Sequence, residues 1–420
     1  MFEQSAVDPH AREAALRDRI AELERQKSAA AAEQARLSVA WEKLRRTAEA
    51  TAGVPASKRG RGLGTEIALA RRESPNQGSK LLGLAKALVH EMPHTLALLT
   101  AGLLSEWRAT LIVRESACLT VEDRRRLDNE LCADPNALEG FGDARITAEA
   151  KKIAYRLDPQ AVVDHAAKAP RDRYVSVRPA PEGMAFVTAC VPMPQGVAVC
   201  ATLDKAVKTN TDDRTRGQVM ADTLVERVTG RPAEEPVPVT VNVVLSDDTL
   251  VDGGNHAATV EGYGPVPADV ARSLITDSLD NDGEVALRRL YAGPAGGALV
   301  AMESKSRTFP KALAQFIRFR DDTCRTPYCN APIRHIDHAH PARRGGPTTA
   351  VNGEGLCEHC NYVKEQSGWA VRVVPGESGR HTAEYTTPTG AVYRSTAPPI
   401  AGGMRVLTRD IHLVMPRRAA

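Results

Sequence analysis

What this sequence has little of narrows its class before any motif is considered. Aromatic residues make up 4% of its 420 residues. No apolar run reaches the length of about eighteen residues that a membrane-spanning helix needs, so we expect no membrane partner. Residues 1–20 contain no apolar core, so we expect no signal peptide and a cytoplasmic protein. The formal net charge of +3 excludes a general polycation.

The composition that remains is typical of a globular protein with several domains. Apolar residues account for 42% and charged residues for 25% of the chain. The N-terminal half is rich in Ala, Leu, Arg and Glu, which favour helices. We predict an α+β multidomain protein: a long helix at 1–50, a mainly helical domain at 60–232, a mixed strand and helix connecting region at 236–304, a C-terminal module at 305–372, and a hairpin and tail at 373–420.

Residues 9–50 show the spacing of one long helix. Apolar residues recur every seven positions at Leu16, Leu23, Ala30, Leu37 and Leu44, with Ile20 and Trp41 at the second seam position. Lys27 and Gln34 interrupt that second row. Two interpretations stay open: a coiled coil that forms a homodimer with a partner chain, or a helix packed onto its own domain.

The apolar spacing from 65 to 230 is mostly helical, and Gly230 is a candidate helix end. Three segments within this range are candidate strands: 173–179, 184–192 and 197–203. Beyond a Pro-rich linker, 239–245 alternates like a strand. The segments after Trp369 predict a small hairpin with Pro-Thr-Gly turn chemistry.

The eight cysteines fall into two groups. Cys118, Cys132, Cys190 and Cys200 are scattered among apolar residues, and we expect them to be buried, reduced thiols. Cys324 and Cys329, then Cys357 and Cys360, form two close pairs separated by 27 residues. Four thiolates at this spacing predict a tetrahedral zinc site. It would be structural, because four thiolates leave no open position for water.

The segment between the cysteine pairs contains an ordered set of polar residues. In "IDHAHPARRGGPTTAVNGEGLCEHCNYVKEQSGW" an Asp-His pair is followed by Gly-Gly-x-Thr, by an Asn five residues before a CxxC, and by a Lys. This set resembles the HNH endonuclease motif in its zinc-bound ββα-metal form, also called the His-Me finger. "RHIDHA" and "TTAV" are then the two strands, and "GLCEHCNYVKEQ" starts the helix.

Upstream segments carry a second resemblance. "EMPHTLALLTAGLLSEWRA", "DRYVSVRPAPEGMAF" and "EGYGPVP" are similar to the actinobacterial thirteen-E-twelve repeat family. In that family a helical "domain of unknown function 222" precedes a C-terminal HNH module. Together the two resemblances cover roughly residues 60–400.

The HNH resemblance implies a role for each polar residue of the motif. His338 is the expected general base, and Asp337 is an expected ligand of a catalytic divalent cation. Asn361 stands where the motif usually ends in His, and an oxygen ligand there favours Mg²⁺ or Mn²⁺. Asn352 matches the central Asn, which holds the loop against the hairpin and so positions His338, with catalysis second.

Positive charge is concentrated in this part of the chain. Residues 305–372 contain eleven Lys and Arg but six Asp and Glu, a net charge of +5. Phosphate groups of DNA are the expected partner of such a segment. Arg343 and Arg344, beside two glycines, are the first candidates for contact with nucleic acid, together with Lys364 and His335.

Three functions remain open at this level. The first is a metal-dependent DNA endonuclease. The second is a zinc-stapled nucleic-acid-binding protein with little or no catalysis, which the missing terminal His supports and the retained Asp337 and His338 oppose. The third is a mobile-element or toxin-type nuclease, in which the N-terminal helix would serve a partner.

Overall fold

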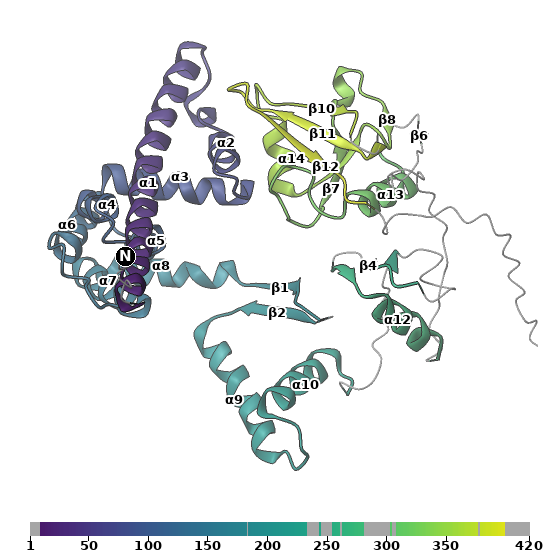
Figure 1. Ribbon diagram of the computed structural model, residues 1–420, viewed down its shortest axis with the longest axis horizontal. Helices are drawn as coiled ribbons and strands as arrows, with labels where there is room; N and C mark the ends of the chain where they lie inside the picture. Colours follow the sequence, from purple (N-terminus) through teal and green to yellow (C-terminus); the bar gives the residue numbers. More distant parts are fainter. Residues whose placement is uncertain are drawn as a thin grey trace, which may run out of the picture. The chain divides into compact units, whose positions relative to one another are not determined.

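The structure is a computed structural model that describes residues 9–182, 184–232, 243–244, 254–260, 263–280, 303–304, 308–376 and 379–399. The chain divides into two compact units, Met1–Tyr174 with Cys190–Pro192 and Val175–Ala189 with Met193–Ala420. Figure 1 shows helices in the first, and helices with small sheets in the second. The fold is therefore α+β, as predicted. None of the described helices is both long and apolar enough to cross a membrane.

Helix α1 (Pro9–Thr51) begins the first unit and confirms the predicted long helix. It packs on α3 (Gly78–His90) and α4 (Pro93–Thr100). The face that it buries carries small residues, namely Ser28, Ala31, Ala32, Ala35 and Ser38. The leucines of the seven-residue row lie outside this face, and Leu16 and Leu44 are 67% and 71% exposed. The helix therefore packs onto its own domain, and pairing of the leucine row with a partner chain stays a prediction.

Further short helices complete the first unit. They are α2 (Leu63–Ala70), α5 (Glu106–Glu115), α6 (Val121–Cys132), α7 (Asp143–Leu157) and α8 (Pro159–Lys168), with 3₁₀ turns η1 (Ala56–Lys58), η2 (Pro75–Gln77) and η3 (Ala169–Asp172). The apolar faces of α5, α6 and α7 meet those of α1, α3 and α4 in one core around Leu99, Ile112 and Leu127. The carboxylate of Asp128 accepts the N–H groups of His94 and Thr95, which caps the start of α4.

A hairpin and two helices follow. Strands β1 (Tyr174–Pro179) and β2 (Ala185–Cys190) form a pair, as predicted. The third candidate strand, 197–203, lies within α9 (Met193–Thr209), so that prediction is wrong. A short apolar run does not by itself distinguish a strand from a helix. Helix α10 (Arg216–Thr229) ends at Gly230, whose φ of 72° fits the left-handed position expected there.

The four scattered cysteines do not share one environment. Cys132 is buried, and burial raises the pKa of its thiol to about 12. Cys118 is half-buried, whereas Cys190 and Cys200 are exposed, so the prediction of burial is wrong for these two. Cys190 ends β2 and Cys200 lies in α9, and both elements are largely exposed. All eight cysteines lie in the described ranges and are free thiols.

The connecting region is described in part. Strands β3 (Val243–Val244), β4 (Ala258–Val260) and β5 (Gly264–Val266) form an antiparallel sheet in that order, followed by α12 (Ala268–Asp280) and β6 (Glu303–Ser304). The strand expected at 239–245 is seen only as β3, and its other residues lie outside the described ranges.

The C-terminal module is built on an antiparallel hairpin. Strand β7 (His335–His338) pairs with β9 (Gly353–Leu356), so that His335 faces Leu356 and His338 faces Gly353. The prediction that "TTAV" returns beside β7 is wrong, because β8 (Thr348–Thr349) pairs with β6 instead. Close packing explains the glycines of β9: a Cβ on Gly355 would lie 2.4 Å from Ile333 Cδ1.

The remaining elements surround this hairpin. Helix α13 (Lys311–Asp321) precedes it, the 3₁₀ turn η4 (Ala342–Arg344) lies between its strands, and α14 (Glu358–Lys364) follows. Strands β10 (Ala370–Val374), β11 (Thr382–Thr386) and β12 (Val392–Thr396) form a three-stranded antiparallel sheet. Ala339 packs with Val371 and Tyr385 of this sheet. The sheet is therefore joined to the module across the boundary expected at residue 372.

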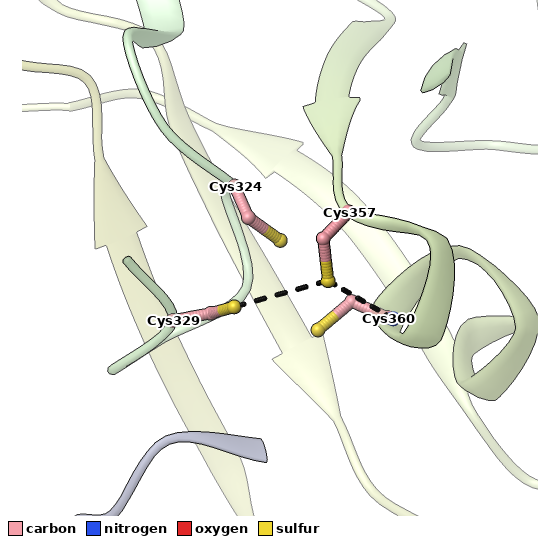
Figure 2. A group of neighbouring side chains, drawn as sticks. All are labelled: Cys324, Cys329, Cys357 and Cys360. Atoms are coloured by element: carbon pink, nitrogen blue, oxygen red, sulfur yellow. Dashed lines mark hydrogen bonds between the residues drawn. The ribbon is translucent and has the colours of Figure 1, made fainter. Parts of the chain in front are cut away.

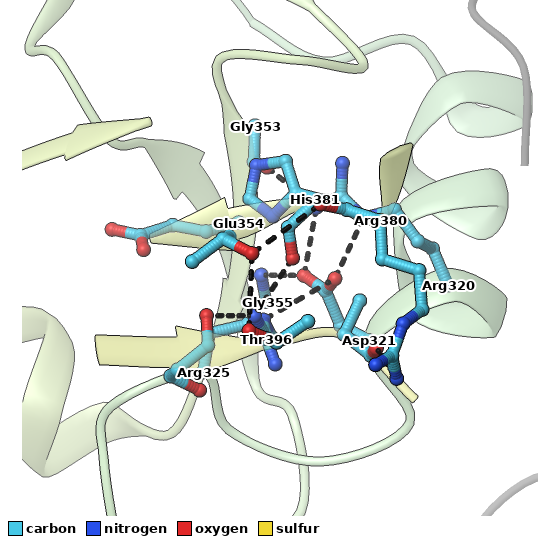
Figure 3. Close-up of polar contacts among 12 residues, drawn as sticks. Arg320, Asp321, Arg325, Gly353, Glu354, Gly355, Arg380, His381 and Thr396 are labelled. Carbon is cyan, nitrogen blue, oxygen red and sulfur yellow. Dashed lines mark hydrogen bonds and ion pairs between the residues drawn. The ribbon is translucent and has the colours of Figure 1, made fainter. Parts of the chain in front are cut away.

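Buried charges connect α13 to the hairpin (Figure 3). The Asp321 carboxylate accepts Arg320 Nε at 2.7 Å and the Gly355 N–H at 2.7 Å. Arg320 Nη2 donates to the Gly353 carbonyl at 2.6 Å. Arg325 Nε lies 3.6 Å from Asp321 Oδ1, so one carboxylate balances two guanidinium groups.

Candidate metal centre and candidate active site

Four buried cysteines come together at the base of the hairpin (Figure 2). Cys324 and Cys329 lie in the loop after α13, Cys357 is the N-cap of α14, and Cys360 lies in its first turn. Their sulfur atoms all lie within 4.8 Å of one another. This cluster could hold a metal such as zinc.

The spacing of the sulfur atoms tests the fit to zinc. Cys329 Sγ and Cys357 Sγ are 3.9 Å apart. A tetrahedral S₄ site with Zn–S bonds of about 2.3 Å has S–S edges of about 3.8 Å. The residues present therefore fit a closed zinc site.

His338 lies at the end of β7 and is 6% exposed. Its Nε2 is 2.9 Å from the Thr348 hydroxyl oxygen. The Phe309 ring packs against the imidazole, with 4.6 Å between ring centroids. Burial lowers the pKa of His338, although the neighbouring Asp337 carboxylate opposes this shift. The imidazole is therefore fixed in orientation and neutral near pH 7.

Asp337 precedes His338, and its side chain is 33% exposed. Oδ1 accepts the backbone N–H of His338 at 2.8 Å, and Oδ2 lies 3.0 Å from Lys364 Nζ. Burial alone would raise the pKa of Asp337, but the Lys364 ammonium and these hydrogen bonds give a net decrease. Asp337 is therefore an anion at neutral pH.

Asn352 connects the loop to the hairpin. Its Oδ1 accepts the His340 N–H at 2.9 Å, and its Nδ2 donates to the carbonyls of His340 at 3.0 Å and Pro347 at 2.8 Å. The loop approaches closely here, since a Cβ on Gly346 would lie 1.8 Å from the His340 carbonyl oxygen. These contacts fix the chain directly after His338.

Asn361 lies on α14 directly after Cys360. Its Oδ1 is buried and has no hydrogen-bond partner among the residues that the structure describes. A buried amide oxygen without a donor is rare in native structures and needs an explanation. A bound cation or an ordered water would satisfy it.

A pocket of about 660 Å³ opens beside the hairpin end. Its lining includes Phe309, Arg318, Asp337, His338, Arg343 and Glu365. Arg343 is exposed and pairs with Glu365 at 2.6 Å, and Arg344 is exposed on the same turn. His335 is half-buried at the start of β7.

Lys364 does not lie where a contact with nucleic acid requires it. Its side chain is 4% exposed, and its Nζ donates to the His338 carbonyl at 2.7 Å. The prediction that Lys364 contacts DNA is therefore wrong for this structure. The ammonium is compensated internally, because Asp337 and Glu354 both pair with it.

Sequence reasoning missed several residues that contact the site. Thr348 belongs to the Gly-Gly-x-Thr element, which could have indicated a role for its hydroxyl. Phe309 and Tyr385 lie outside the motif. Glu354 lies within it, at a position to which the motif assigns no role. The sequence gives no sign that Glu354, between two glycines, is fully buried.

The fold and the cysteine cluster define an α+β protein whose C-terminal part could hold a metal. A family model described as "Domain of unknown function (DUF222)" matches residues 22–321, and the chain belongs to this family.

The uncharacterized protein Rv3776 of Mycobacterium tuberculosis (strain ATCC 25618 / H37Rv) is 34% identical over 142 residues, covering 33% of this chain. The match spans 24% of that relative's length. No solved structure matches the chain. The family match ends before Cys324 and so does not include the cysteine cluster.

Proposed function

We propose that the chain is a metal-dependent HNH endonuclease that hydrolyses phosphodiester bonds in DNA. One observation carries this proposal: a buried histidine, His338, lies beside an anionic Asp337 on the wall of an open pocket. The ordered HNH-like motif between the cysteine pairs supports the same reaction.

His338 is the general base. We assign the Nε2 proton to a hydrogen bond with the Thr348 hydroxyl, which leaves the lone pair of Nδ1 for proton transfer. As a water oxygen bonds to phosphorus, its proton passes to Nδ1 and the bond from phosphorus to a sugar oxygen breaks. The lowered pKa of His338 keeps this base unprotonated near pH 7.

Asp337 and Asn361 are the residues that would hold a divalent cation. The Asn361 Oδ1, which has no hydrogen-bond partner in the described part of the chain, and the Asp337 carboxylate are hard oxygen ligands, which suit Mg²⁺ or Mn²⁺. When bound, such a cation neutralises the charge that builds on the phosphate and the leaving oxygen.

The cysteine cluster would hold a structural zinc. Cys357 and Cys360 begin α14, the helix that carries both Asn361 and Lys364. A zinc ion there would fix the start of this helix relative to the loop that contains Cys324 and Cys329. Arg343, which lines the pocket, and Arg344, which is exposed on the same turn, are the candidate contacts to the phosphate backbone.

The experiment that tests this function separates binding from cleavage. An end-labelled DNA duplex is incubated with wild type, His338→Ala and His340→Ala, and both binding and cleavage are followed in Mg²⁺. His340 is an exposed histidine two residues away and serves as the matched control. We expect His338→Ala to bind DNA without cutting it and His340→Ala to cut. Binding without cleavage by all three proteins would favour the nucleic-acid-binding alternative.

A further inference from the structure

A lysine ammonium lies inside the module directly behind the proposed cation ligand. Lys364 Nζ is 3.0 Å from Asp337 Oδ2, 3.2 Å from Glu354 Oε1 and 2.7 Å from the His338 carbonyl oxygen. Burial of a charge is costly unless it is paired and hydrogen-bonded. All three contacts compensate it, and the attraction of Glu354 and Asp337 outweighs burial, so the pKa of Lys364 is raised.

Glu354 completes this arrangement from the neighbouring strand. It lies directly opposite Asp337 in the β7–β9 register and is fully buried. Its Oε2 accepts the Tyr385 hydroxyl at 2.6 Å, which fixes the carboxylate from the other side. Like charges opposite each other in an antiparallel pair repel. Lys364 lies within ion-pair distance of both carboxylates and removes that repulsion.

The orientation of Asp337 follows from these contacts. Oδ2 is paired with the buried ammonium, whereas Oδ1 lies 2.8 Å from the His338 backbone nitrogen and 3.6 Å from Nδ1 of the same residue. Asp337 itself lines the pocket. Each oxygen accepts one hydrogen bond, but the ammonium at Oδ2 repels a divalent cation, whereas the N–H at Oδ1 is neutral, so a cation is expected on Oδ1.

We propose that Lys364 and Glu354 are positioning residues that restrict Asp337 to one-oxygen ligation and thereby select small divalent cations over Ca²⁺. Mg²⁺ and Mn²⁺ suit octahedral sites with single carboxylate oxygens, whereas Ca²⁺ takes more oxygen ligands and often both oxygens of a carboxylate. This inference rests on the proposed function, because it assumes that Asp337 binds the cation.

The test compares metal affinities in the zinc-loaded full chain by calorimetric titration with Mn²⁺ and with Ca²⁺. The variant is Lys364→Met with Glu354→Gln, which removes both buried charges together. The matched control is Arg372→Met with Glu384→Gln, an ion pair of the neighbouring sheet. We expect the first variant to lose about 10-fold or more in Mn²⁺ affinity, as for other residues that orient metal ligands. Its Ca²⁺ affinity should stay within about two-fold, and the control should keep the wild-type ratio.

Three results would overturn the proposal. An equal fall in the affinities for Mn²⁺ and Ca²⁺ would mean that Lys364 contributes to folding but not to the choice of cation. A gain in Mn²⁺ affinity would mean that the ammonium competes with the cation. Equal Mn²⁺ binding by wild type and Asp337→Asn would overturn both this inference and the proposed catalytic metal site.

A second measurement uses the wild type and so does not depend on folding of a variant. A crystal structure with Mn²⁺ should show the ion bonded to Oδ1 but not to Oδ2 of Asp337, with Lys364 Nζ still at hydrogen-bond distance from Oδ2. Ligation through both oxygens, or a displaced Lys364, would contradict the proposal.

Discussion

The helical first unit and the C-terminal module bury different kinds of side chain. The first unit has one continuous core of Leu, Ile and Ala, and Asp128 in it caps a helix. The module has small apolar clusters interleaved with buried charges such as Arg320, Asp321 and Lys364, and with four cysteines. A core of apolar residues needs no chemistry beyond packing. The concentration of costly buried charges and thiols in the module is the reason for placing the proposed reaction there.

Loss of the cysteine cluster should have the largest effect on stability, and that effect should be confined to the module. Cys357→Ser, or removal of zinc by a chelator, should unfold the module, because structural zinc contributes on the order of 10 kcal/mol to folding. Hydrogen exchange should rise across 308–399 and stay low in the helical core. Cys200→Ser, which changes an exposed thiol, is the control. A zinc-free module that keeps its protection would contradict the account.

A single substitution in each region sharpens the comparison. Asp321→Asn leaves the buried guanidinium groups of Arg320 and Arg325 without a counter-charge, which should cost about 3–5 kcal/mol of unfolding free energy. Leu127→Ala in the helical core should cost about 2–5 kcal/mol through the cavity it leaves. Denaturant unfolding with hydrogen exchange measures both. If Asp321→Asn were neutral, the buried ion network would not stabilise the module.

The module should also respond to pH through His381. Burial, and then the positive charge of Arg320, lowers the pKa of His381 from 6.5 to about 4. Above pH 6.5 both folded and unfolded states are neutral at this residue. Between pH 6.5 and 4 only the unfolded state takes up the proton. The free energy of unfolding therefore decreases as the pH is lowered through this range, by at most about 3 kcal/mol.

His381→Gln should flatten this part of the pH profile of stability. Titrating chemical denaturation at several pH values for both proteins isolates the contribution of His381 from that of other groups. Identical slopes for wild type and variant would show that His381 does not titrate in this range.

The smallest expected effect is on catalysis, through the residue that orients His338. Thr348→Val removes the hydroxyl at 2.9 Å from Nε2, and should lower the cleavage rate about 10- to 100-fold, or ~1.4–2.7 kcal/mol. Thr348→Ser keeps the hydroxyl and should retain most activity. The rates are compared under single-turnover conditions, and equal rates for the Val and Ser variants would remove Thr348 from the account.

The two regions also differ in what their sequence reveals. In the first unit, apolar spacing predicted α1, since such periodicity is a local property, and in the second unit Gly230 predicted the end of α10. In the module, the cysteine spacing predicted the cluster, because two close pairs of thiols at this spacing can share one metal. The motif predicted that Asp337 and His338 share one site, and their side chains do lie close, with 3.6 Å between Oδ1 and Nδ1, although successive side chains of a strand usually point to opposite faces.

The remainder depends on contacts distant in sequence. The pairing of β7 with the glycine-rich β9 needs packing against Ile317 and Ile333, which no local pattern encodes. Burial of Lys364 depends on Glu354, ten residues earlier, and on strand register. The net charge of the segment does not distinguish buried from exposed lysines, so Lys364 was predicted to lie on the surface. Chemical type was readable from the sequence, whereas burial and partners were not.

The most direct test of the central claim is cleavage of a supercoiled plasmid by the zinc-loaded full chain in Mg²⁺ or Mn²⁺. The account predicts relaxed or linear DNA with wild type, and none with His338→Ala or with EDTA. Cleavage by His338→Ala at the wild-type rate, or no cleavage by folded wild type in either metal, would contradict it.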